Sequence, residues 1–144
     1  MAKKENHTFI RNGKLKAQAI VEFMLLLPIL LLLVLGAIDF GRLFYVKIVL
    51  TNAAREGANY LAFHKFDQDD GFVQTCGVVQ AEAASSGVQI YPEEVQYLNC
   101  CTQGSKVGVQ VTKSVNLVFD GMLQSLGLLN GPIVLENTVY MVVQ

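Results

Sequence analysis

The feature that most constrains this chain is an apolar run over residues 23–38, FMLLLPILLLLVLGAI, in which no side chain is charged or forms hydrogen bonds. Twelve of these sixteen residues are Leu, Ile, Val or Phe. At roughly −0.3 to −0.6 kcal/mol each, they favour membrane insertion by about −4 to −7 kcal/mol. With residues 19–21 in front, the run approaches the ~20 residues that cross a bilayer as a helix. Only Glu22 interrupts it, so the sequence predicts one transmembrane helix.

Positive charge is concentrated before this run. The first sixteen residues carry five Lys or Arg residues against one acid, Glu5, whereas Arg42, Lys47 and Arg55 follow the run. Because positive flanks favour the cytoplasmic side, we expect a cytoplasmic N-terminus and an extracytoplasmic C-terminal domain. The net charge is −1 and no basic cluster follows the run, so the sequence does not indicate a nucleic-acid partner.

A cleaved secretory signal also begins with basic residues and an apolar core. The core here is longer than the roughly 7 to 15 residues of such signals. No small-x-small cleavage site ends it, because Leu35 stands two residues before Ala37. The pattern therefore favours a retained anchor.

Beyond residue 38 the sequence becomes amphipathic. Apolar or small residues recur at helical spacing at Leu43, Val46, Leu50, Ala53, Gly57 and Leu61. We predict one helix over residues 18–62, roughly 65 Å long at about 1.5 Å per residue, embedded to about residue 38. Asp39 and Arg42 can pair at i, i+3 where the helix leaves the apolar zone. Pro28 predicts a kink or local melting over residues 24–28, unless it is simply a tolerated transmembrane proline.

Residues 63–144 are predicted to form a small extracytoplasmic domain. Residues 67–71, DQDDG, indicate a turn; as a calcium loop they fail, because the glycine comes one position too early and Val78 stands where the distal Glu belongs. A short Ala-rich helix is expected over residues 73–86, ending near Gly87.

The end of the chain alternates apolar and polar residues as strands do. We expect strands over residues 94–100, 107–119 and 133–143, with Lys113 as the exception on the apolar face of the second. Three strands with one apolar face beside an amphipathic helix predict an antiparallel sheet packed on that helix, an α+β fold. Between the last two strands lies a loop with five apolar residues, which either covers the core or contacts a neighbour or the membrane surface: Met122, Leu123, Leu126, Leu128 and Leu129.

The three cysteines are Cys76, Cys100 and Cys101. Outside the cytoplasm, a disulfide from Cys76 to one of the adjacent pair would stabilise a small domain, and the other cysteine would be left over. The sequence has no CxxC pair and only His64 nearby, so we expect no metal site and no cofactor. No nucleophile elbow or phosphate loop is present either, and we interpret the protein as a non-enzyme.

Four short motifs resemble one known family. They are residues 18–23 (QAIVEF), Pro28, residues 38–42 (IDFGR) and residues 52–58 (NAAREGA). Together they make residues 17–61 similar to the N-terminal region of TadE-like proteins, the pseudopilins of bacterial tight-adherence (Tad) pilus systems. The resemblance covers about a third of the chain.

The resemblance implies a life cycle like that of a type IV pilin. Residues 1–17 would be a leader that a prepilin peptidase removes on the cytoplasmic side by cutting between Ala17 and Gln18, where the family usually has glycine before the cut. The mature chain would then assemble with other pilin subunits, on an inner-membrane assembly platform, through a helix that includes Glu22, Phe23 and Pro28. Adhesion and secretion are the processes that such a pilus serves.

Glu22 needs a cation or water, because an unpaired charge in hydrocarbon costs several kcal/mol. The cut would create an α-amine at Gln18, and attraction between this amine and Glu22 of a neighbouring subunit would set the assembly register. In the other interpretation, Glu22 sits at headgroup depth beside Lys14 and Lys16. A membrane-tethered binding module, with the helix serving only as anchor, is the alternative function.

Overall fold

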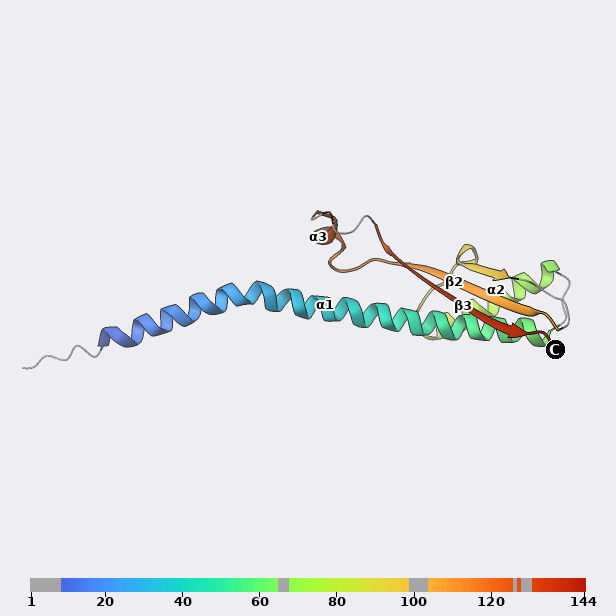
Figure 1. Cartoon of the computed structure of the whole chain (residues 1–144), viewed down its shortest axis with the longest axis horizontal. Coiled ribbons are helices and arrows are strands. Elements are labelled where there is room, and N and C mark those ends of the chain that lie inside the picture. The colour runs from blue at the N-terminus through green and yellow to red at the C-terminus, as the bar shows by residue number, and fades with distance from the viewer. Residues whose placement is uncertain (1–8, 65–67, 99–103, 126, 128–130) are drawn as a thin grey trace, which may run out of the picture. The chain divides into compact units, whose positions relative to one another are not determined.

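The computed structural model describes residues 9–64, 68–98, 104–125, 127 and 131–144. Its elements are α1 (Phe9–Phe63), α2 (Gln68–Ser85), a 3-10 turn (Pro92–Glu94), β1 (Val95–Leu98), β2 (Lys106–Val115), α3 (Asp120–Ser125) and β3 (Ile133–Val142) (Figure 1). The chain divides into two compact units, Met1–Ile38 and Asp39–Gln144. A long apolar helix and a small antiparallel sheet confirm the predicted α+β class.

Helix α1 contains the whole of the predicted helix and begins nine residues earlier than residue 18, at Phe9. Residues 24–28 are helical, so the local melting considered for Pro28 does not occur. The first unit is bent within the blue part of the ribbon (Figure 1). A bend is the expected result of a proline that has no N–H to donate to the preceding turn.

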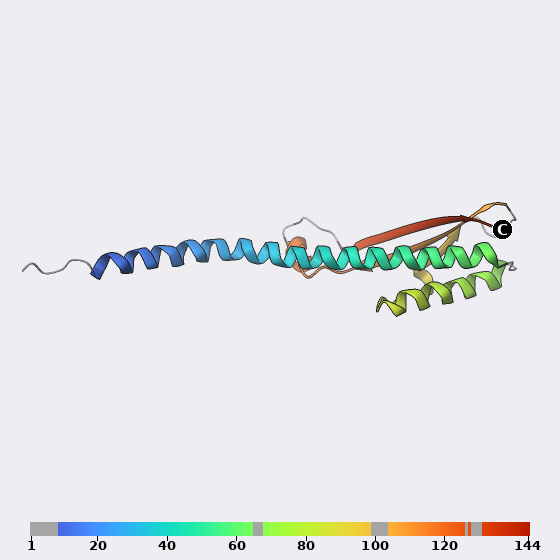
Figure 2. The ribbon, with the colours of Figure 1, turned by 90° about the horizontal axis from the view of Figure 1, so that it is seen from below.

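The second unit is built on the C-terminal part of α1. The sheet has the strand order β1-β2-β3, and both pairs are antiparallel. Val95 lies opposite Val111, and Val115 lies opposite Ile133. Helix α2 and the sheet lie on different sides of α1 (Figure 2). The small residues of α1 therefore face two partners at once.

The core contains side chains from all of these elements. Leu50, Val79, Val107, Val109 and Val111 are fully buried, and Ala53, Ala54 and Ala58 of α1 lie among them. The buried valines of β2 alternate along the strand, as the sequence pattern predicted. Since every second side chain of a strand points to the same face, this alternation gives β2 one face for the core.

Lys113 is the charged residue on the apolar parity of β2. Its Nζ lies 3.0 Å from Oε1 and 2.9 Å from Oε2 of Glu94, and 5.0 Å from the centre of the Tyr91 ring. Both charged side chains are 18% exposed. The ion pair and the cation–π contact allow a lysine to lie at the edge of the apolar face.

The ends of several elements differ from the predictions. Residues 68–71 form the first turn of α2 and not the predicted turn, and acidic residues at a helix N-terminus are favoured by the helix dipole. Strand β2 ends at Val115, whereas the strand was predicted to continue to residue 119. Part of the predicted loop, Asp120–Ser125, is helical. The alternation of apolar and polar residues continues past Val115, the last paired residue of β2, and the predicted strand was therefore too long.

The end of α2 near Gly87 is confirmed. Gly87 has a φ of +72°, a conformation that favours glycine. The Val88 N–H donates to the Ala83 carbonyl at 3.0 Å, and the Gly87 N–H donates to the Ala84 carbonyl at 2.9 Å. These two bonds form a Schellman motif, which satisfies carbonyls that the helix end would leave free.

Gly57 sets the distance between α1 and its partners. A Cβ at this position would lie 2.5 Å from Cγ2 of Val79 and 3.4 Å from Cγ1 of Val109. Val79 is fully buried and β-branched, so its methyl group cannot easily move away. Glycine here allows close packing of α1 against α2 and the sheet.

Gly57→Ala should therefore lower the free energy of unfolding by about 1–3 kcal/mol, because the added methyl overpacks the core. Gly77→Ala in α2 is the matched control: an added Cβ there meets nothing within 4 Å, so it should gain about 1 kcal/mol of helix propensity. Thermal unfolding of the detergent-solubilised chain, followed by circular dichroism, measures both. Equal stability of the two variants would contradict the close packing at Gly57.

Candidate assembly site in the N-terminal helix

Residues 17–38 of α1 expose their apolar side chains. None of these side chains is buried, and Met24, Leu25 and Leu33 are 67%, 71% and 70% exposed. By length and composition, the part of α1 over Ala17–Phe63 is long and apolar enough to cross a membrane. An apolar surface of this size is characteristic of contact with lipid or with another apolar helix. The segment that was predicted to mediate assembly is therefore exposed and can make such contacts.

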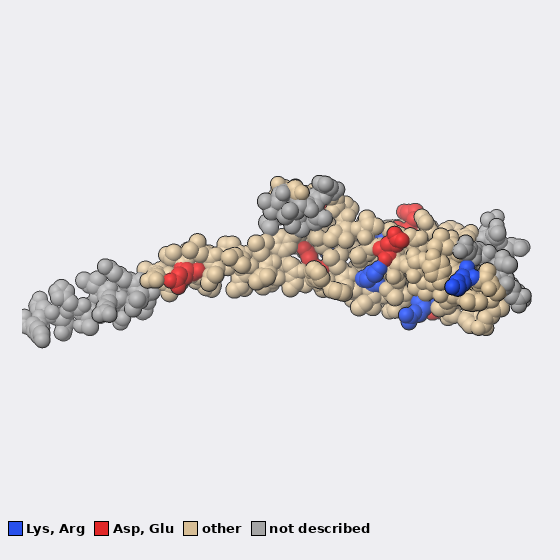
Figure 3. Space-filling model, viewed as in Figure 1, with Lys and Arg blue, Asp and Glu red and all other residues tan. Residues whose placement is uncertain are grey.

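One carboxylate interrupts this surface. Glu22 is the only charged residue between Ala17 and Ile38, and the corresponding tan segment in Figure 3 carries a single red group. Its Oε1 accepts a hydrogen bond from Nε2 of Gln18 at 3.1 Å, one helical turn away. The structure thus brings together two predicted site residues, one beside the predicted cut and one at the proposed assembly carboxylate.

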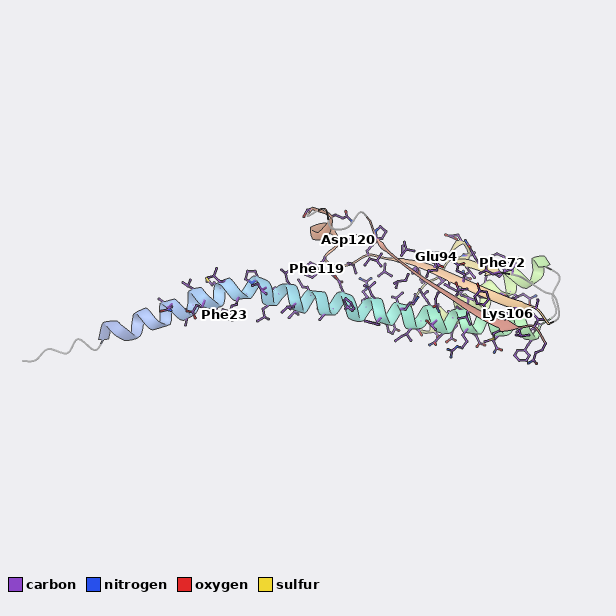
Figure 4. The ribbon with its side chains drawn as sticks, viewed as in Figure 1. Phe23, Phe72, Glu94, Lys106, Phe119 and Asp120 are labelled. Carbon is purple, nitrogen blue, oxygen red and sulfur yellow. The ribbon has the colours of Figure 1, made fainter. Side chains whose placement is uncertain are left out.

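The other predicted residues of this helix lie on either side of that pair. Ala17 is exposed and precedes Gln18 within α1. Phe23, labelled in Figure 4, is 60% exposed, and Pro28 lies inside the helix. Leader cleavage and the assembly roles of these residues stay predictions.

Asp39 makes contacts that the sequence did not indicate. It is 5% exposed, and its Oδ1 and Oδ2 accept hydrogen bonds from the N–H groups of Val118 at 2.9 Å and Phe119 at 3.2 Å. These contacts join α1 to the segment between β2 and α3. The Asp39–Arg42 ion pair stays a prediction, and Arg42 is exposed one turn further along the helix.

Two more side chains of α1 hold the second unit together. The Tyr45 hydroxyl donates to the Ser86 carbonyl at 2.6 Å, at the end of α2. Nζ of Lys47 donates to the Glu136 carbonyl of β3. With Asp39 they are three side chains, within nine residues of one helix, that bind distant backbone groups. Sequence reasoning missed all three, because the partners lie 41 to 89 residues away and leave no periodic signal.

Cys76 lies in α2 and is 5% exposed. Burial raises the pKa of this thiol, because it disfavours the charged thiolate. Cys100 and Cys101 lie outside the described residues, so the disulfide from Cys76 stays a prediction. Within the described part of the chain, no group of three His, Cys, Asp or Glu residues could hold a metal ion.

Comparison with protein families identifies residues 17–59 as matching the family described as TadE-like protein. The match spans the apolar segment, Asp39 and Arg42, and ends within the core-forming part of α1. It confirms, over less than a third of the chain, the resemblance inferred from the sequence motifs. Together with the long apolar helix, the match suggests a protein associated with the Tad pilus and anchored in a membrane. Comparisons with curated proteins and with solved structures found no match.

The contacts of Asp39 give a testable expectation. Asp39→Ala should destabilise the second unit by about 2 kcal/mol, because two partly buried N–H groups lose their acceptor. Asp39→Asn keeps one acceptor oxygen, so its stability should lie between that of Asp39→Ala and that of the wild type. Hydrogen exchange measured by mass spectrometry should show faster exchange at Val118 and Phe119 in Asp39→Ala.

Glu93→Ala, which removes an exposed acid elsewhere in the same unit, is the control and should leave exchange at Val118 and Phe119 unchanged. Wild-type exchange at these two amides in Asp39→Ala would show that the carboxylate does not hold them.

Proposed function

Because residues 17–59 carry the TadE-like sequence, we propose that this protein is a minor pilin or pseudopilin of a Tad-type pilus or of its secretion machinery. The observation that supports this role most directly is an apolar helical segment, without a single buried side chain over residues 17–38, continuous with a folded α+β unit. Such a segment can be held first by lipid and later by the helices of other subunits, and the folded unit does not need it for its own core.

The proposed topology follows from the charges. The basic leader, residues 1–17, stays in the cytoplasm, residues 18–38 cross the inner membrane, and the folded unit lies outside. A prepilin peptidase removes the leader between Ala17 and Gln18 on the cytoplasmic side. The mature subunit then joins other pilin subunits at the inner-membrane assembly platform, and assembly carries it from the membrane into the extracellular pilus.

Glu22 gives this assembly a register. Before the cut, its carboxylate has a neutral partner, the Gln18 amide. The cut creates a positive α-amine at Gln18, and a neighbouring subunit can present this amine to Glu22. Two unit charges about 4 Å apart attract by roughly 4 kcal/mol at an effective dielectric of about 20. Since a buried unpaired charge is costly, subunits offset from this register are disfavoured.

Phe23 and Pro28 shape the surface around this pair. Phe23 is exposed beside Glu22 and offers apolar contact area at the same level of the helix. Pro28 leaves the carbonyl one turn before it without its usual donor and permits the helix to bend. Both features let α1 adjust to neighbouring helices when it leaves the lipid.

Leader removal is the first test. In cells that contain the prepilin peptidase, mass spectrometry of the membrane-extracted protein should find a mature chain that begins at Gln18. Ala17→Gly should increase the processed fraction, because glycine is the residue usually found before the cut in this family. Ala19→Gly, two positions along the same helix, is the control and should not increase it. An intact N-terminus in every variant would remove the α-amine and with it the proposed pairing.

The second test concerns Glu22. Glu22→Ala and Glu22→Gln remove the charge and should reduce the assembled fraction by about tenfold or more, the effect of 1.4 kcal/mol, while membrane insertion is unchanged. Glu22→Asp keeps the charge and should retain part of the assembly. The measurement is the ratio of protein in sheared pili to protein in the membrane.

Glu136→Gln removes an exposed acid of β3 and is the control for net charge. Replacing residues 18–38 with an unrelated transmembrane helix separates the two functions: a tethered binding module keeps its function after the swap, whereas a pilin loses assembly. Normal assembly of Glu22→Ala would refute the register role.

A further inference from the structure

The segment between β2 and α3 is hydrogen-bonded to Asp39, the residue of α1 that directly follows the apolar run. Ile38 is the last residue of the apolar run, and Asp39, the next residue of the same helix, is the first polar one. If residues 18–38 span the membrane as proposed, Asp39 lies at the extracytoplasmic boundary of the hydrocarbon. Any group in contact with Asp39 lies within a few Å of that boundary.

The segment between β2 and α3 is such a group. Its backbone N–H groups at Val118 and Phe119 lie 2.9 and 3.2 Å from the Asp39 carboxylate oxygens. Figure 4 shows Phe119 and Asp120 at the end of the second unit where β2 leads toward α3. The position of this segment relative to Asp39 is therefore fixed by direct contact.

Several exposed side chains around this contact are apolar, and one cation, Arg42, is exposed among them. Val118 is 60% exposed although its backbone is held. On α1, Phe40 and Phe44 are 64% and 61% exposed, and their ring centres are 5.6 Å apart. These two rings, with Leu43, Lys47 and Leu135, line an open hollow of about 280 Å³. An apolar surface next to a membrane span can lie in the interface, where large amphipathic and aromatic groups are enriched.

We propose that Val118 and the first turns of α1 after Ile38 form a second membrane contact, in which this surface rests in the headgroup region of the leaflet that α1 leaves. The occupant is lipid, because Phe40 and Phe44 continue directly from the lipid-facing segment on the same helix, and hydrogen bonds to Asp39 hold the backbone of Val118 to that helix. The contact then has two effects. The two N–H groups stabilise the Asp39 carboxylate at the boundary, and Asp39 holds Val118 against the bilayer. The proposal rests on the membrane anchorage proposed above.

The chain has no tryptophan, so a single introduced Trp reports on one position. Val118→Trp, Leu30→Trp and Val73→Trp are the three reporters, each in the full-length chain reconstituted in phosphatidylcholine–phosphatidylglycerol vesicles. Val73 is 70% exposed in α2. The neighbouring Gln74 accepts a hydrogen bond from Tyr60 at 2.8 Å, which places this position about 30 Å along the helix from Asp39 at about 1.5 Å per residue.

Emission is measured with lipids that are brominated near the headgroup end or near the middle of the acyl chains. We expect Trp at 118 to lose emission mainly with the shallow bromines, Trp at 30 to lose it mainly with the deep ones, and Trp at 73 to keep it with both. As a second measurement on the unmutated chain, a lipid with a photoreactive group near its headgroup should label residues 117–120 more than residues 72–75.

Each other outcome has a defined meaning. Trp at 118 that behaves like Trp at 73, while Trp at 30 is quenched, overturns the second contact and leaves the anchorage intact. Absence of quenching at position 30 overturns the anchorage itself. Emission at 118 that is blue-shifted, insensitive to bromine and dependent on protein concentration shows that a second copy covers the surface, and this also overturns the proposal.

Discussion

Helix α1 is one continuous helix with two kinds of surface: an exposed apolar segment, and a part that packs into the core of the second unit. Over residues 17–38 most of its side chains are large, apolar and exposed, whereas from Val46 onward it contributes small and medium side chains to a protein core. The large side chains suit lipid, because they present a broad apolar surface to a fluid partner. The small ones suit a core, because Ala53, Ala54 and Ala58 let α2 and the sheet approach the helix axis. The rest of the second unit depends on this change of side-chain size.

The polar contacts of the same helix lie close to this change. Asp39, Tyr45 and Lys47 bind backbone groups of three different segments: the segment between β2 and α3, the end of α2, and β3. Backbone groups at the ends of elements or on edge strands have no partner inside their own element. The Lys47 contact also places a charge at the open edge of β3, one of the ways in which proteins protect such edges from pairing with other chains. The helix therefore supplies both the packing surface and the hydrogen-bond partners of the unit.

Most of this fold could be predicted from the sequence, because the features that decide it are periodic. The apolar run, the helical spacing from Leu43 to Leu61 and the alternation in β2 and β3 each follow from local rules that one chain segment displays by itself. The start of α2 and the end of β2 were predicted wrongly, because polarity and alternation do not mark where hydrogen bonding between segments begins or ends. The role of Asp39 was missed for a related reason: its partners are backbone groups 79 and 80 residues away, and any residue type supplies such a group.

The two carboxylates at the ends of the apolar segment, Glu22 and Asp39, differ in how many hydrogen bonds they accept within their own subunit. Asp39 is nearly buried and accepts two hydrogen bonds from the folded unit, so its charge has partners within its own subunit. Glu22 is exposed and has one neutral partner on its own helix. A carboxylate in apolar surroundings with so little compensation gains more from an added cation than one that is already bonded. Glu22 interrupts the apolar run, whereas Asp39 directly follows it. Their contacts distinguish them: in the proposed assembly Glu22 is the group left for a second subunit to pair with, whereas Asp39 joins α1 to the segment between β2 and α3.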